Sequence, residues 1–282
     1  MTKAPAAALP PVAVGGVGGS GTRLVAQLLR AAGIHTGDDL NAASDTLWFT
    51  LLFKRVEILQ CDDAQFDLLV QVLVDALCGG APIAPAMESM VRGLSREERP
   101  QHSAHWLQQR AESLIAATRQ PRSTGNWGWK EPNTHIVIER LWQRLPELRY
   151  VHVVRHGVDM AFSRNQNQLR LWGPHVLGED GPITPSRSLA YWCRVHQRMQ
   201  DLLAANSHRM YWLDYDALCR APLIEAGRLC RFLGCEVDLM VPMLEQIRAA
   251  EEPRRATAAL DQFDAGDLAF VHSLGYAISQ AA

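Results

Sequence analysis

The chain has 282 residues, of which 48% are hydrophobic and 21% charged, so it holds enough apolar material for one large buried core. Its formal net charge of −2 gives no general affinity for nucleic acid, and any anion-binding site must therefore be local. No apolar run is long enough to span a bilayer, and the N-terminal decapeptide lacks the apolar core of a signal peptide, so we expect a cytoplasmic protein without stable membrane insertion.

The first predicted unit is a strand, a glycine-rich turn and a helix over residues 12–32. Five glycines between Gly15 and Gly21 let the backbone close around a phosphate without side-chain clashes. The helix that begins at the turn offers unpaired N–H groups and the positive end of its dipole. The pattern predicts a phosphate-binding loop, and a tight turn that only packs a strand on a helix is the alternative.

The glycines fit two different nucleotide-binding frames. Gly16–Gly21 fits the G-x-x-x-x-G frame of nucleoside triphosphatases, but Thr22 and Arg23 stand where those proteins carry Lys and Ser or Thr. The same glycines also fit the dinucleotide frame G-x-G-x-x-G, with Asp38 or Asp39 roughly at the distance of its acidic partner. The glycines alone therefore leave open which phosphate is bound.

The middle of the chain differs from its two ends. Between about Thr46 and Arg119 the sequence shows helical runs at 47–59, 64–77 and 105–118, interrupted by Pro82, Pro85 and Pro100. We therefore expect a helical insertion in a sheet protein. Further along, the glycine- and proline-rich stretch Leu171–Pro185 predicts a mobile loop.

A second strand carries the next functional signal. Tyr150–Val154 reads as a buried strand that ends in Arg155 and then enters a helix, and an arginine there points into the crevice where α/β folds bind ligands. Ser163 lies about two helical turns further on, where its hydroxyl can share an anion with the guanidinium. Helix Ser186–Ala204 and strand Met210–Leu213 continue the sheet.

Together these motifs resemble the sulfotransferase family, whose members move a sulfuryl group from 3′-phosphoadenylyl sulfate (PAPS) to an acceptor. Ser20-Gly21-Thr22 resembles the family's 5′-phosphosulfate loop, and Arg155 and Ser163 match the Arg and Ser that bind the 3′-phosphate. Trp129-Lys130-Glu131-Pro132 resembles the Lys-x-Pro element of bacterial and tyrosylprotein-type members. The segment 213–218 resembles the Tyr-Glu-Asp-Leu strand end, and the four elements stand in family order.

The resemblance implies an α/β fold with a P-loop-like parallel sheet flanked by helices and interrupted by a helical insertion. It implies one sulfotransferase domain over residues 1–282, with the 5′-phosphosulfate loop unit at 12–36, an acceptor-binding insert at 46–122 and the 3′-phosphate-binding and C-terminal part at 123–282. The implied acceptor is a hydroxyl or amine on a small molecule, glycan or lipid. The cysteines and histidines show no metal-ligand spacing, so we expect no metal.

The resemblance also implies a set of donor-binding residues, namely Gly18, Gly19, Ser20, Gly21, Thr22, Arg23, Arg155, Ser163 and Tyr215. Family members usually carry Lys or Arg where this chain has Gly19, and that cation stabilises charge on the leaving phosphate. Another basic group must take its place, and Lys130 and Arg23 are the candidates.

Two more expectations concern the base and the nucleotide clamp. In tyrosylprotein and heparan-type members the general base is a Glu a little over twenty residues past the loop, so the resemblance implies Asp38 or Asp39 here, with a capping or turn aspartate as the alternative and Glu131 and His35 as the next choices. The glycine-containing clamp of cytosolic members is absent, and Arg248, Arg254 and Arg255 lie in the region that could replace it.

Two other functions stay open. A P-loop nucleotide-binding protein of kinase-like or regulatory type would explain the glycines, but the lysine of that motif is missing and no clear Mg²⁺-binding aspartate follows an apolar strand. A PAPS binder without catalysis would follow if nothing replaces the cation absent at Gly19.

Overall fold

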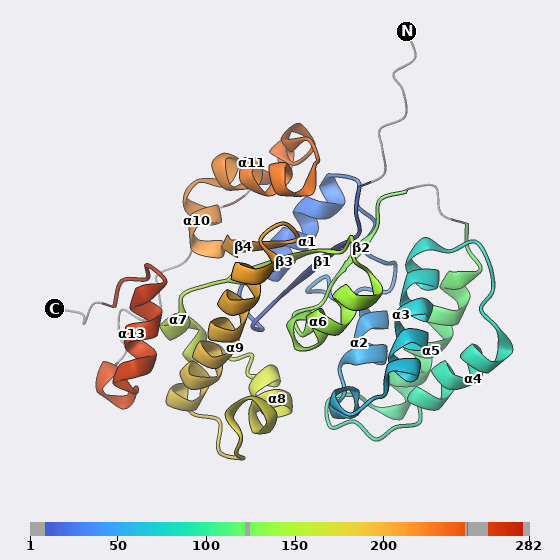
Figure 1. Cartoon of the computed structure of the whole chain (residues 1–282), viewed down its shortest axis with the longest axis horizontal. Helices are drawn as coiled ribbons and strands as arrows, with labels where there is room; N and C mark the ends of the chain where they lie inside the picture. The colour runs from blue at the N-terminus through green and yellow to red at the C-terminus, as the bar shows by residue number, and fades with distance from the viewer. Residues whose placement is uncertain (1–8, 122–124, 246, 248–258, 279–282) are drawn as a thin grey trace, which may run out of the picture.

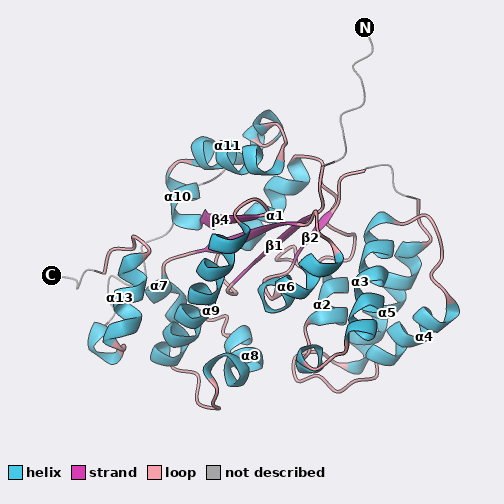
Figure 2. Cartoon of the chain, in the orientation of Figure 1, coloured by secondary structure: helices cyan, strands magenta, loops and turns pink. Residues whose placement is uncertain are grey.

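A four-stranded sheet forms the centre of the computed structural model, which describes residues 9–121, 125–245, 247 and 259–278. The strands are β1 (Val12–Gly16), β2 (Gly128–Lys130), β3 (Arg149–Val154) and β4 (Met210–Asp214), in the order β2-β1-β3-β4. Every pairing is parallel, and helices enclose the sheet (Figure 2). The predicted α/β class with a parallel sheet is confirmed. The three-residue strand β2 was not predicted, because it is too short to show an alternating pattern.

The helices that connect and cover these strands fall into two groups. Those of the insertion are α2 (Leu47–Phe53), α3 (Asp63–Cys78), α4 (Pro85–Leu94) and α5 (Ala104–Thr118), with a 3₁₀ turn at Val56–Leu59. The others are α1 (Thr22–Ala31), α6 (Thr134–Arg144), α7 (Gly157–Ala161), α8 (Asn167–Leu177), α9 (Pro185–Asn206), α10 (Tyr215–Arg220), α11 (Pro222–Leu233), α12 (Val241–Leu244) and α13 (Ala265–Ser273). Helices α2 to α5 gather on the β2 side of the sheet (Figure 1). Within the described ranges, none of the helices is apolar over a length that could cross a membrane.

The two faces of the sheet bury separate cores, because successive strand residues point to opposite faces. Val12 and Val14 join one core with α1 and α11. Ala13 and Trp129 join a larger core that also holds α6, α9 and the insertion helices. The sheet is thus buried on both faces, and its carboxyl edge is left to carry the site.

The insertion is helical, but two of its details differ from the prediction. The run 47–59 does not form one helix, because α2 ends at Phe53 and a 3₁₀ turn follows. Pro85 does not interrupt a helix but begins α4, where its missing N–H would have had no helical partner.

The prediction of a loop over Leu171–Pro185 is wrong for its first part. Helix α8 continues to Leu177 and contains Pro174. Trp172 is buried, and its indole N–H donates to Asn133 Oδ1 at 2.7 Å. The packing of α8 therefore outweighs the helix-breaking tendency of proline.

Candidate active site

The glycine loop joins the end of β1 to the start of α1. Gly16, Gly19 and Gly21 have φ angles of 150°, 100° and 95°, in the region that favours glycine. A Cβ atom on Gly21 would overlap the ring of Tyr215, and one on Gly16 would overlap the carbonyl oxygen of Val153. The loop thus needs its glycines both for backbone conformation and for close approach.

Arg155 and Tyr215 lie at this loop, although they are far apart in the sequence. They follow β3 and β4, whose carboxyl ends meet the end of β1 because the three strands are parallel and in register. The Arg155 guanidinium lies 5.2 Å from the centre of the Tyr215 ring, and that ring packs against Gly21. The structure therefore brings these two residues together with the loop.

Ser163 lies beside the same loop, but not on the continuous helix that was predicted to carry it. Helix α7 ends at Ala161, so Ser163 lies in the following turn and not two turns along a continuous helix. Its Oγ lies 3.2 Å from where a Cβ on Gly19 would stand, and the Asn165 amide nitrogen lies 3.3 Å from the same position on Gly18. The loop therefore faces the residues that follow α7.

Two buried polar groups here have no hydrogen-bond partner among the described residues. They are Oγ of Ser20, a residue that is 0% exposed, and Nε of Arg155. Thr22, at the start of α1, is also buried. Because an unsatisfied buried polar group costs about 1–3 kcal/mol, these groups are suited to bind an anionic ligand that would satisfy them.

Arg23 lies on the exposed first turn of α1. With Gly21, Tyr215 and Cys219 it lines a cavity of about 370 Å³. Arg23 therefore stands beside the predicted nucleotide-binding residues. The arginines predicted to replace the nucleotide clamp, Arg248, Arg254 and Arg255, lie outside the described residues.

Lys130, at the end of β2, is 1% exposed, so the ammonium is removed from solvent. It donates to the Ala43 carbonyl at 2.9 Å and to the Asp45 carboxylate. The Asn41 amide donates to the other Asp45 oxygen at 2.7 Å. Ser44, with φ of 61°, completes this turn in a conformation that non-glycine residues rarely adopt. The chain thus strains its backbone where it presents Asp45 to Lys130.

Asp38 and Asp39, the predicted bases, lie earlier in the same segment. Asp39 forms an ion pair with Arg110 of α5, with 3.0 Å between Oδ2 and Nε. The Asp38 carboxylate is 53% exposed and lies 3.9 Å from His35 Nε2. The sequence signal for all three aspartates was the same, an acidic residue past the loop, and only the fold shows which carboxylate is bonded to Lys130.

A model of the sulfotransferase family matches residues 10–238. The chain belongs to the sulfotransferase family. The resemblance read from the sequence motifs is therefore confirmed. Comparison with curated proteins gave no match.

Several solved sulfotransferase structures resemble this chain at low sequence identity. One from Mycobacterium avium is 15% identical, with 97% of this chain and 78% of that chain covered and a TM-score of 0.49. The sulfotransferase domain of the Synechococcus olefin synthase is 17% identical, with 96% of each chain covered and a TM-score of 0.49. One from Alicyclobacillus acidocaldarius is 14% identical, with 96% of each chain covered and a TM-score of 0.47.

Gln168 and His156 support this candidate site from neighbouring helices. The Gln168 amide donates to the Gly16 carbonyl oxygen at 3.0 Å, which fixes the start of the glycine loop. His156 Nδ1 accepts from the Val158 N–H at 3.2 Å and so caps α7. No local sequence signal marks the Gln168 contact, because it joins residues far apart in the chain.

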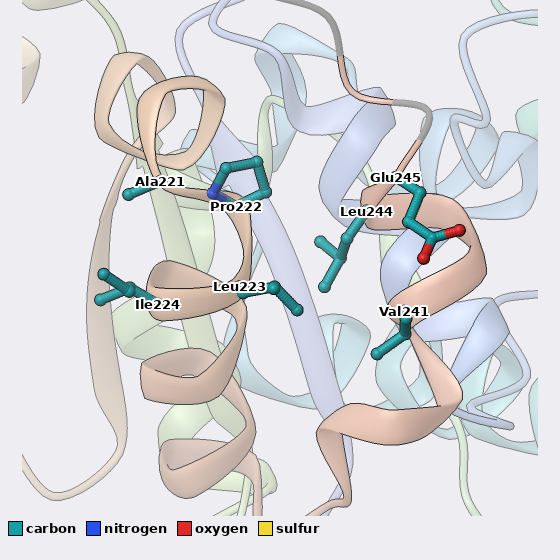
Figure 3. A pocket seen from close by; sticks show the side chains of 7 residues that line it. All are labelled: Ala221, Pro222, Leu223, Ile224, Val241, Leu244 and Glu245. Atoms are coloured by element: carbon teal, nitrogen blue, oxygen red, sulfur yellow. The ribbon is translucent and has the colours of Figure 1, made fainter.

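A second cavity of the sulfotransferase lies between α11 and α12 (Figure 3). Its lining residues are Ala221, Pro222, Leu223, Ile224, Val241, Leu244 and Glu245. Leu223 and Leu244 face each other across it (Figure 3). Since its lining is apolar apart from one carboxylate, it does not suit the phosphates of a nucleotide.

Proposed function

We propose that the protein transfers a sulfuryl group from PAPS to a hydroxyl or amine acceptor by in-line displacement, without a metal. One observation carries this proposal: Ser20, Arg155 and Ser163 meet at a glycine loop that leaves buried polar groups without partners. Membership of the sulfotransferase family supports the reaction class.

The donor would be held at both of its ends. Backbone N–H groups of 18–22, at the start of α1, would bind the 5′-phosphosulfate, where the helix dipole favours negative charge. Arg155 and Ser163 would bind the 3′-phosphate, because a guanidinium and a hydroxyl together make strong bonds to phosphate oxygens. Tyr215 and Arg23 would contact the nucleotide from the neighbouring cavity.

Lys130 would supply the cation that Gly19 lacks. PAPS supplies an activated sulfuryl group, and negative charge builds on its phosphate as the S–O bond breaks. A desolvated ammonium stabilises such charge more strongly than one in water. The burial of Lys130 therefore favours it over the exposed Arg23 for this role.

Asp45 is the carboxylate that we assign as general base, in preference to Asp38 and Asp39. It accepts hydrogen bonds from Asn41 and from Lys130, so it is the carboxylate held next to the proposed catalytic cation. The acceptor hydroxyl would pass its proton to Asp45 as its oxygen bonds to sulfur. Asp39 pairs instead with Arg110 of the insertion helix α5, away from the Lys130 ammonium.

Replacing Arg155 by alanine should weaken the binding of adenosine 3′,5′-bisphosphate by about 2–4 kcal/mol, because it removes a charge-assisted contact to a phosphate. Isothermal titration calorimetry measures this change. Arg231→Ala, which removes an exposed positive charge on α11, is the matched control. Unchanged affinity in the Arg155 variant would remove this residue from the donor site.

A further inference from the structure

A second group of cationic side chains lines a small cavity in the helical insertion. The cavity has a volume of about 60 Å³ and lies between the end of α2, the turn before α5, and α8. We call it the insert cavity, and its lining residues are Lys54, Arg55, Val56, Glu57, Glu98, Arg99, Pro100, Gln101, His102 and Leu171. None of these residues belongs to the candidate active site.

The insert cavity contains buried nitrogen atoms without partners. Arg55 is 4% exposed, and the Arg99 side chain is 6% exposed. Arg55 Nη2, Arg99 Nε and His102 Nε2 make no hydrogen bond with any described residue, and the Gln101 carbonyl oxygen is also unpaired. Two nearly buried guanidinium groups with free N–H donors are suited to bind a ligand, because such donors are almost always satisfied.

The two buried guanidinium groups share one carboxylate, and the charge of Lys54 acts on the buried Glu131. Arg55 and Arg99 both bind one carboxylate, that of Glu97, each at 2.9 Å. Among the described residues, no hydrogen bond or ion pair is made by the ammonium of the half-buried Lys54. Glu57 and Glu98 also line the cavity, but both are exposed to solvent. The buried part therefore keeps an excess of positive charge.

The low pKa of His102 agrees with an excess of positive charge in the insert cavity. Burial, together with the charges of Lys54 and Arg99, lowers the pKa of His102 to about 4. A positive potential disfavours the protonated, positively charged form of His102. The same potential attracts an anion.

We propose that the insert cavity binds a small oxyanion, namely a carboxylate, phosphate or sulfate group, through Arg55, Arg99 and Lys54. Planar guanidinium groups match the geometry of these oxyanions, and their hydrogen bonds are charge-assisted. The cavity has room for one such group and its water but not for a nucleotide.

The position of the insert cavity connects it to the proposed acceptor side of the site. Burial raises the pKa of Glu131, next to Lys130, and the charge of Lys54 opposes this rise. The Gln101 amide donates to the carbonyl of Asn167, the first residue of α8, at 3.2 Å. We therefore assign the oxyanion to one end of the acceptor. This assignment rests on the proposed function, whereas anion binding itself does not.

Thermal melting with inorganic phosphate tests anion binding, with chloride at equal ionic strength as the reference. The measurement uses the Arg155→Ala protein, in which phosphate binding at the proposed 3′-phosphate site is weakened. The loop N–H groups stay intact in it, so the response to a change of Lys54, and not the shift alone, assigns phosphate to the insert cavity. We expect phosphate to raise its melting temperature still. Adding Lys54→Gln should raise the phosphate concentration needed for the same shift about tenfold, because one charge-assisted contact is lost. Adding Arg96→Gln, which removes an equal charge outside the cavity, should leave the required phosphate concentration unchanged. Any other pattern overturns the proposal.

Acceptor kinetics identify where the oxyanion comes from. A hydroxyl acceptor that carries a carboxylate is compared with its methyl ester, using labelled PAPS. The acceptor assignment predicts a KM about tenfold lower for the acid, a preference that Lys54→Gln removes and Arg96→Gln keeps. Equal KM values, together with phosphate binding, would overturn that assignment and leave a free anion as the ligand. If no acceptor is sulfated, the proposed function fails, while the melting experiment still decides anion binding.

Discussion

Replacing Lys130 by methionine should lower kcat by about 100- to 1,000-fold, because the variant loses the cation that stabilises charge on the leaving phosphate. The affinity for adenosine 3′,5′-bisphosphate should change by no more than about threefold, since a contact made mainly in the transition state affects kcat more than binding. Steady-state kinetics with labelled PAPS and calorimetry on the same protein measure the two effects. An equal loss in nucleotide affinity would contradict this role for Lys130.

A double variant separates the structural contribution of the Lys130–Asp45 pair from the proposed catalytic roles of these two residues together. Lys130 is buried and paired with Asp45, so removing it alone leaves an unpaired carboxylate and should destabilise the fold. Lys130→Met with Asp45→Asn removes both charges, and we expect stability to recover while activity stays low. Recovery of activity would show that Lys130 is structural. Asp45→Asn alone should also lower kcat, whereas the matched change Asp38→Asn at an exposed carboxylate should have little effect.

Acidification from pH 7 to pH 5 should cost the fold about 4–6 kcal/mol through three buried histidines. Burial lowers the pKa of His135 to about 3 and of His196 to about 4, and it lowers the pKa of His152 well below its ordinary value. Their rings pack edge to face in one cluster, with centres 6.3 Å apart for His135 and His152 and 5.1 Å for His152 and His196. In the unfolded chain each titrates near pH 6.5, so between that pH and about pH 4 the unfolded state binds protons that the folded state does not.

The stability due to these histidines is therefore present above about pH 6.5 and is lost as the pH falls, by about 2 kcal/mol each at pH 5. Denaturant unfolding at a series of pH values measures the slope. His196→Gln should reduce the slope by roughly one third, because one of three titrating groups is removed. The same change at the exposed His208 is the control. Stability that does not change between pH 7 and pH 5 would contradict neutral burial of the cluster.

The glycine loop and Arg155 could be predicted because each is marked by neighbouring residues in the sequence. The glycine loop is visible in the sequence because a strand, glycines and a helix follow one another. Arg155 is visible because it ends a buried apolar strand. The parallel sheet agrees with the same signals, since parallel strands need a crossover connection and that connection is usually a helix.

Long-range contacts explain what the sequence could not predict. The contact that sets Asp45 apart from Asp38 and Asp39 is the one with Lys130, which lies 85 positions away. Gln168 reaches Gly16 across 152 positions. Helix α8 contains a proline that local rules place in a loop, and only the buried packing of Trp172 accounts for it.

Thermal melting with nucleotides in the absence of Mg²⁺ tests the central claim most directly. If the glycine loop, Arg155 and Ser163 bind PAPS, adenosine 3′,5′-bisphosphate should raise the melting temperature without a metal, and ATP should do little. Stabilisation by Mg-ATP alone would contradict the account and favour a nucleotide-binding protein of the kinase-like or regulatory type.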